Sequence, residues 1–202
     1  MKNSTFNQSI LIFLLIGTSA FGQGLLKNAK YIEVGGLVGF GQTMDRQSVP
    51  EGAYNPYTFV GHFSMDLIRQ EKLKGIFPGR FLLASEPQVN YVKLESTPSR
   101  NEWEFGLVTV LQYMYPIHPR LHIYALGGSG PFWISTQTVV QKQGFLFCNY
   151  FGIGVYFFPF KDEKIAINLG FRARHMSNAN IWQPNNGINS HLIVIGLTRF
   201  LK

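Results

Sequence analysis

Large apolar residues alternate with small or polar residues, with a period of two, along segment after segment of this chain. In residues 164–175 one phase holds Ile165, Ile167, Leu169, Phe171 and Ala173, and the other holds Ala166, Asn168, Gly170, Arg172 and Arg174. Successive side chains of a β-strand point to opposite faces of the sheet, so this alternation indicates strands. Residues 102–112 and 145–157 repeat the pattern. The chain is therefore predicted to be all-β.

Three features favour a sheet in a membrane over a water-soluble sandwich. The expected strands are about 10 residues long or longer, as a tilted membrane strand requires. One phase is large and apolar while the other is small or polar, the reverse of a soluble barrel. Aromatic residues gather near strand ends, for example Tyr113, Tyr115 and Phe157, as the girdles of membrane barrels do. Hydrocarbon offers no partner for backbone amides, so such a sheet must close on itself.

The alternation predicts strands at 30–41, 56–68, 81–95, 102–115, 120–134, 145–158, 164–177 and 189–200. We therefore expect one domain, residues 23–202, that forms an eight-stranded antiparallel transmembrane β-barrel. A barrel of about eight strands has an interior filled by side chains, so a pore is not expected. Arg172 and Arg174 fall in the interior phase, where we expect them to pair with Glu102 or Glu104.

Residues 1–22 have the pattern of a secretory signal peptide: a charged start, the apolar run 10–16, and then small residues. A membrane-anchor helix would need about 20 apolar residues. The one cysteine of the chain, Cys148, lies far downstream, which excludes a disulfide framework and a lipid-anchoring cysteine after the signal. The formal charge of +7 suits an anionic lipid, and no interleaved basic and aromatic motif suggests nucleic acid. We expect a barrel in the outer membrane of a Gram-negative bacterium.

The residues that could carry out a chemical reaction lie between 171 and 189. His175 and Ser177 continue the outward, lipid-facing phase of their strand just beyond its apolar part, where packing gives no reason for them. A nucleophile and a base on the outer wall at the membrane rim could reach a lipid. Asn189 is in the outward phase of the next strand, so we expect it beside His175, and Asn185 could turn an amide donor toward the same place. Together these residues would supply a nucleophile, a base, an orienting group and an oxyanion donor.

The pattern H-x-S-N-A at 175–179, followed by P-N-x-G-x-N at 184–189 and a closing strand, resembles the outer-membrane lipid A 3-O-deacylases. The motif match covers about residues 171–200. The resemblance implies hydrolysis of the ester-linked acyl chain at the 3-position of lipid A, the membrane anchor of lipopolysaccharide, with no cofactor and no metal. It also implies roles for four residues: base for His175, nucleophile for Ser177, oxyanion binding for Asn185 and support of the site for Asn178.

One residue departs from the family pattern. Members of the family carry Glu as the third residue of the triad, where this sequence has Asn189, and no Asp or Glu follows Glu163. An amide can orient the His175 ring but cannot balance an imidazolium charge; in a serine protease the acid-to-amide change lowers turnover by about 10⁴-fold. Three alternatives stay open: Asn189 suffices in a slow enzyme, a carboxylate arrives from another strand, or the site is degenerate.

Other functions also stay open. The chain could be a non-catalytic outer-membrane barrel, serving binding or envelope structure, with a degenerate deacylase motif. It could also be an esterase or phospholipase that acts on other lipids from the same outward site. Phe171 and Trp182 either line an acyl groove or belong to the aromatic girdle. Whether the barrel is a monomer or a homodimer is a further open alternative.

Overall fold

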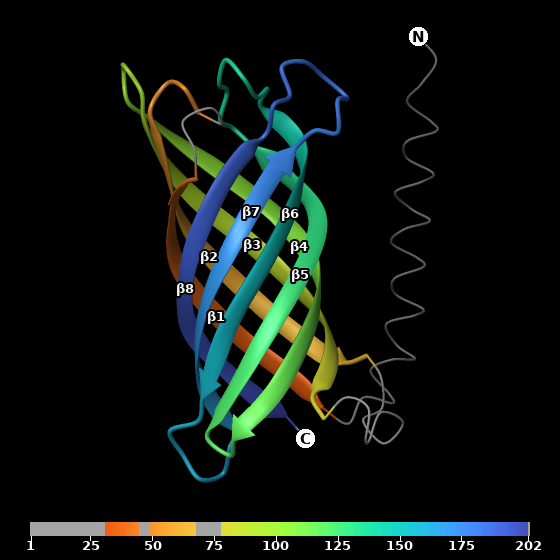
Figure 1. The fold of residues 1–202 in the computed structure, drawn as a ribbon. Helices are drawn as coiled ribbons and strands as arrows, with labels where there is room; N and C mark the ends of the chain where they lie inside the picture. Colours follow the sequence, from red (N-terminus) through yellow and green to blue (C-terminus); the bar gives the residue numbers. More distant parts are fainter. Residues whose placement is uncertain (1–30, 45–48, 68–77, 202) are drawn as a thin grey trace. The chain divides into compact units, whose positions relative to one another are not determined.

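The computed structural model describes residues 31–44, 49–67 and 78–201. The predicted signal peptide, residues 1–22, lies outside the described residues. Eight antiparallel strands close into a barrel: β1 (Ile32–Thr43), β2 (Ala53–Asp66), β3 (Arg80–Glu95), β4 (Arg100–His118), β5 (Leu121–Ile134), β6 (Gly144–Phe157), β7 (Ile165–Ser177) and β8 (Ile188–Leu201) (Figure 1). Each strand pairs with its neighbour in sequence, and β1 pairs with β8. The predicted eight-stranded barrel is confirmed.

Within the described ranges, no helix combines the length and the hydropathy needed to cross a bilayer.

Prolines account for the two largest differences between the expected and the observed strands. β2 begins at Ala53 and includes Pro56, which pairs in register with Val92. β4 continues through Pro116 to His118, and its register with β5 shifts between these two residues. Because proline lacks a backbone N–H, it is tolerated in a strand at a bulge or where no ladder bond is needed. The strand therefore runs three residues beyond its expected end at 115, and it bulges at Pro116 instead of ending before it.

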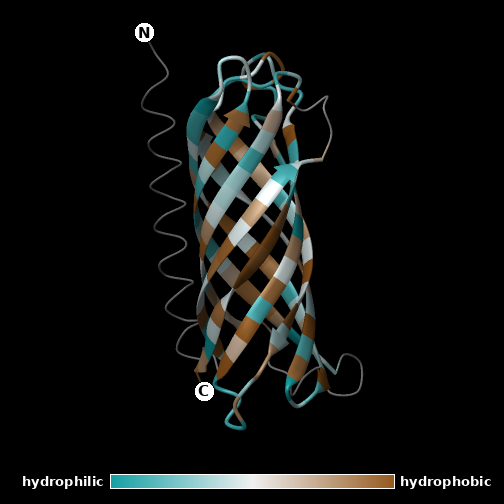
Figure 2. Cartoon of the chain, turned by 90° about the vertical axis from the view of Figure 1, so that its left-hand side faces the viewer, coloured by the Kyte–Doolittle hydropathy of each residue, from teal (hydrophilic) through white to brown (hydrophobic). Residues whose placement is uncertain are grey.

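Apolar side chains cover the outside of the barrel. Hydrophobic and hydrophilic residues alternate along the strands, coloured brown and teal in Figure 2. The outward row of β7 from Ile165 to Phe171 is exposed, and so is the outward row of β8 from Ile193 to Leu197. The interior instead buries polar and charged groups, including Glu33, His62, Glu86, Asn90, Glu104, Gln112, Asn168, Arg172 and Arg174. This inside-out distribution suits a barrel whose outer solvent is hydrocarbon.

Both interior arginines have carboxylate partners, but only one has the expected partner. Arg174 Nη1 lies 2.9 Å from Glu104 Oε2, as predicted. Arg172 binds Glu86 of β3 through two hydrogen bonds, of 2.5 and 3.0 Å, and not Glu102 or Glu104. Glu102 lies near the start of β4 and pairs with Arg100. The alternation fixes which side of the wall a residue faces, whereas the tilt of the strands fixes its height, so the partner of Arg172 was not evident from the sequence.

The two ends of the barrel differ in what they hold. Ile32 pairs with Leu201, so the chain enters β1 and leaves β8 at the same end. At the opposite end, which we call the distal rim, β1, β3, β5 and β7 finish and the even-numbered strands begin. The 178–187 connection lies at the distal rim and borders the motif residues.

Candidate active site

β7 places His175 and Ser177 on the outer wall at the distal rim. The outward row of this strand runs through Phe171 and Ala173 to His175 and then to Ser177, its last residue. His175 is exposed and Ser177 is half-buried, whereas Met176 between them is fully buried in the interior. The predicted pair thus projects from the apolar wall where that wall ends.

Asn189 of β8 holds the His175 ring. The two residues are register partners, and His175 Nδ1 lies 2.7 Å from Asn189 Oδ1. Since the amide oxygen can only accept, Nδ1 donates its proton, and the lone pair of the ring is on Nε2. No ion pair joins His175 to a carboxylate in the part of the chain that the structure describes. The alternative of a carboxylate supplied by another strand therefore finds no support among these residues.

Ser177 shares the outer face with His175 but is not hydrogen-bonded to it. Within the described residues, the Ser177 hydroxyl has no hydrogen-bond partner. Catalytic hydrogen bonds are often long or absent without substrate and form only in the reacting complex. The arrangement therefore offers a base nitrogen, Nε2, and a hydroxyl on one face, with an amide that orients the base.

The 178–187 connection is braced by its own asparagines. Asn178 is buried; its backbone N–H donates to Asn185 Oδ1 (2.7 Å), and its side chain donates to the carbonyl of Trp182 (2.8 Å). Asn185 Nδ2 in turn donates to Asn180 Oδ1 at 3.0 Å. Asn178 therefore braces the connection beside His175 and Ser177, and its role in supporting the site stays a prediction. Asn185 uses both ends of its amide within the loop here, so binding an oxyanion would require Nδ2 to leave Asn180.

Two residues that the sequence reasoning did not single out shape the site. Gly187 has φ +81°, and a Cβ built there would lie 2.5 Å from His175 Cε1. The Gly187 N–H donates to Gln141 Oε1 at 3.1 Å, and Gln141, fully buried, comes from the 135–143 connection. The glycine of the P-N-x-G-x-N pattern could have indicated that the backbone at 187 approaches a side chain closely, because glycine has no Cβ. Nothing in the local sequence pointed to Gln141.

We expect Gly187→Ala to lower the activity of the protein more than its stability. The added Cβ would press on the imidazole and strain a backbone with positive φ, so His175 would move off its bond to Asn189. A 1 Å misplacement of a reacting group can cost about 10²-fold in rate. Hydrolysis rates beside urea unfolding curves would measure both effects. A variant as active as the wild type would show that the ring does not depend on this close approach.

The two proposed groove residues are both exposed, at different places. Phe171 lies on the outer wall of β7, where its ring stacks on His191 of β8 at 6.1 Å between centroids. Trp182 lies in the 178–187 connection with an exposed side chain. A groove role and a girdle role are both compatible with these positions, so the groove stays a prediction.

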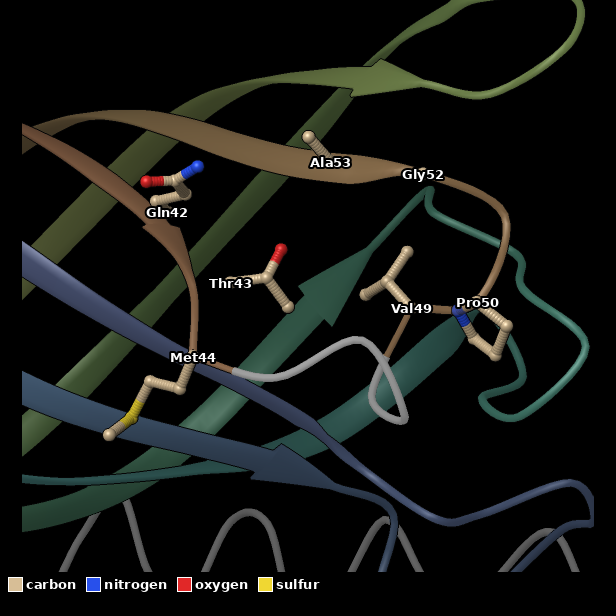
Figure 3. Close-up of a pocket in the computed structure, with 7 residues that line it drawn as sticks. All are labelled: Gln42, Thr43, Met44, Val49, Pro50, Gly52 and Ala53. Atoms are coloured by element: carbon tan, nitrogen blue, oxygen red, sulfur yellow. The ribbon is translucent and has the colours of Figure 1, made fainter.

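A hollow of about 460 Å³ opens at the distal rim between β1 and β2, lined by Gln42, Thr43, Met44, Val49, Pro50, Gly52 and Ala53 (Figure 3). It lies beside β8, because Met44 N–H donates to the Asn189 carbonyl at 3.0 Å. None of the predicted site residues lines this hollow. The candidate active site is therefore a feature of the outer wall and not of this hollow.

Comparison with known protein families assigns the chain to a family. The family model of the lipid A 3-O-deacylase (PagL) matches residues 70–198, which include β3 to β7, most of β8 and the whole motif block. The chain belongs to the lipid A 3-O-deacylase (PagL) family. The predicted family is thus confirmed, and with it the assignment of the barrel to the outer membrane. No match is found among curated protein sequences.

Solved structures agree with the fold. The crystal structure of the outer-membrane enzyme PagL superposes with a TM-score of 0.53 at 19% identity, covering 81% of this chain and 97% of that one. Neisserial surface protein A (NspA) superposes with a TM-score of 0.52 at 11% identity, covering 84% of this chain and 95% of the other. At these identities the likeness shows the barrel fold alone, so the PagL family assignment rests on the family match.

Proposed function

We propose that this chain hydrolyses the ester-linked acyl chain at the 3-position of lipid A. The observation that supports this best is the outward placement of His175 and Ser177 at the membrane rim, with Asn189 Oδ1 2.7 Å from the His175 ring. Lipid A presents its ester bonds where acyl tails meet the head group, which is the level at which the apolar row of β7 ends. Membership of the PagL family supplies the substrate class.

The reaction would proceed through an acyl-enzyme. Ser177 Oγ attacks the ester carbonyl while His175 Nε2 accepts its proton. Asn185, once its amide turns outward, would donate to the oxyanion. His175 then returns the proton to the leaving 3-hydroxyl of the sugar. A water molecule next attacks the acyl-enzyme carbonyl while His175 Nε2 accepts its proton, and Ser177 Oγ leaves with that proton as the fatty acid is released. Asn189 keeps Nε2 aimed at Ser177 throughout.

Expression in a Gram-negative host without other lipid A deacylases tests the proposal. Mass spectrometry of extracted lipid A should show the loss of one hydroxyacyl chain, and the free hydroxy fatty acid should appear in equal amount. Unchanged lipid A beside a folded barrel in the outer membrane would favour the non-catalytic alternative. Release of fatty acid from phospholipids instead would favour the phospholipase alternative.

We expect Asn189→Glu to raise the rate of hydrolysis. The carboxylate would accept the same Nδ1–H bond and would also balance the imidazolium that forms when His175 takes the proton. The opposite change costs about 10⁴-fold in a serine protease, so the gain here should be at least about tenfold. Steady-state rates of the two purified barrels on lipid A would measure it.

Asn189→Leu is the matched loss variant, because it keeps the branched shape and the number of heavy atoms of the side chain but cannot accept from Nδ1–H. It should be far slower than the wild type. A sharp loss of activity in Asn189→Glu would show that Asn189 does not orient the base. The homodimer left open by the sequence has no support from the comparisons, so the proposal concerns a single barrel.

A further inference from the structure

A row of polar side chains crosses the outer wall of the barrel and ends at the candidate active site. It consists of successive register partners from β3 to β8: Ser85, Thr109, Ser129, Asn149, His175 and Asn189. All six are outward-facing and at least partly exposed. The remaining outward residues around this row are all apolar, aromatic or glycine. This holds for residues 81–91 of β3, 103–117 of β4, 123–133 of β5 and 145–157 of β6.

Asn149 is the member of this row next to His175 on the side away from Asn189. It is half-buried, and within the described residues its amide has no hydrogen-bond partner. The neighbours above and below it on the wall are Phe147 and Phe151, and Phe151 is 74% exposed. An amide in an apolar wall, facing hydrocarbon without a partner, is unfavourable by a few kcal/mol, on the order of 2–7. This position therefore suits a polar group that arrives with a lipid.

The height of Asn149 indicates which part of the lipid it would meet. Ser177 pairs with Phe147 at the distal rim, and Asn149 lies two residues further from that rim on β6. A sugar bound at Ser177 lies toward the rim, whereas the acyl chain of the same ester runs into the membrane. Asn149 is thus on the acyl side of the scissile bond.

The distances fit a group close to the ester carbonyl. Directly opposed residues such as Asn149 and His175 have Cβ atoms about 4.5–5.5 Å apart, and diagonal ones such as Asn149 and Ser177 are about 7–8 Å apart. The carbonyl carbon bonded to Ser177 Oγ and the amide of Asn149 would both lie in the space between these two Cβ atoms. A hydroxyl on the β-carbon of the acyl chain, two carbons from the carbonyl, would come within hydrogen-bonding distance of the amide.

We propose that Asn149 binds the β-hydroxyl of the acyl chain that is released, so that the enzyme prefers 3-hydroxyacyl esters over plain acyl esters. This inference rests on the proposed deacylase function and adds a residue that determines the specificity of that site. The Asn149 carbonyl accepts from the hydroxyl, or its N–H donates to the hydroxyl oxygen, while Phe147 and Phe151 contact the methylene groups. Asn149 is a specificity residue and takes no part in the proton transfers.

The test compares two lipid A substrates that differ only in the β-hydroxyl of the 3-O-acyl chain. We expect the wild-type barrel to cleave the hydroxylated ester with a kcat/KM about tenfold higher, since one hydrogen bond of this kind separates the two substrates. Asn149→Leu should bring this ratio close to one, mainly by slowing the hydroxylated ester. Asn149→Ala serves as a second variant of smaller volume, and a gel-shift assay of the folded barrel shows that each variant has folded.

Asn101 of β4 provides the matched control, because it is an exposed outward amide that pairs with Lys93, away from the row. Asn101→Leu should keep the wild-type ratio. If the wild type cleaves both esters equally, or if Asn149→Leu keeps the preference, the role of Asn149 is overturned and the deacylase function stands. If the folded wild type cleaves neither ester, the proposed function fails and this inference fails with it.

Discussion

Replacing Ser177 with alanine should abolish lipid A hydrolysis while leaving the barrel folded. The variant removes the proposed nucleophile and leaves the rest of the outer wall unchanged, because Ser177 has no hydrogen-bond partner among the described residues. In other serine hydrolases, loss of the nucleophile lowers turnover by far more than about 10³-fold. We expect a loss of at least about 1,000-fold in kcat on purified lipid A, with little change in KM.

Ser85→Ala is the control for this variant. Ser85 is also an outward-facing serine, but it lies on β3, at the far end of the polar row from Ser177. Its removal should leave the rate unchanged. His175→Ala should be about as inactive as Ser177→Ala, and the double variant no worse, because in the proposed mechanism the two residues act as one unit. Substantial activity in Ser177→Ala would exclude it as the nucleophile.

Glu86→Ala should destabilise the barrel far more than the loss of an exposed ion pair does. Glu86 is fully buried and binds Arg172 through two hydrogen bonds, His62 Nδ1 at 2.8 Å, and the Tyr150 hydroxyl. Alanine would leave the Arg172 charge in the interior without its partner. Breaking a buried ion pair in this way costs about 3–5 kcal/mol of unfolding free energy.

Urea unfolding of the barrel in lipid vesicles would measure this loss. Glu95→Ala is the matched control, because both side-chain interactions of Glu95 are exposed: its Oε1 lies 3.6 Å from Lys93 Nζ and accepts a hydrogen bond from Asn55 Nδ2 at 3.3 Å. Exposed pairs contribute about 0–1 kcal/mol, so this control should unfold almost as the wild type does. Equal unfolding midpoints for the two variants would contradict a stabilising role for the interior ion pairs.

The fold was predictable from the sequence because a closed sheet in lipid has few degrees of freedom. The period of two defined the strands, and the inverted polarity of the two phases placed the apolar one outside. The position of each side chain along the barrel axis was not predictable. Arg172 was correctly predicted to face inward, but its partner Glu86 is brought to it by the tilt of β3 and the closure of the barrel, which no local pattern encodes. The start of β2 and the end of β4 were also predicted wrongly, because prolines lie within these strands.

The candidate site was predictable in part for the same reason. The outward phase of β7 and β8 sufficed to bring His175 and Asn189 together, since neighbouring antiparallel strands share a face. The contacts of Gly187 with His175 and of Gln141 with Gly187 join separate connections, which strand periodicity does not reach. Asn149 also escaped notice, because only the register of β6 with β7 sets it opposite His175.

The most direct test of the central idea, that a nucleophile on the outer wall reacts with lipid at the membrane rim, is covalent labelling of the full barrel in lipid vesicles. A lipid-tailed fluorophosphonate should add to a single residue, Ser177, as located by peptide mass mapping. Labelling should fall sharply in His175→Ala. A barrel that cleaves lipid A but carries the adduct elsewhere, or none at Ser177, would contradict the account.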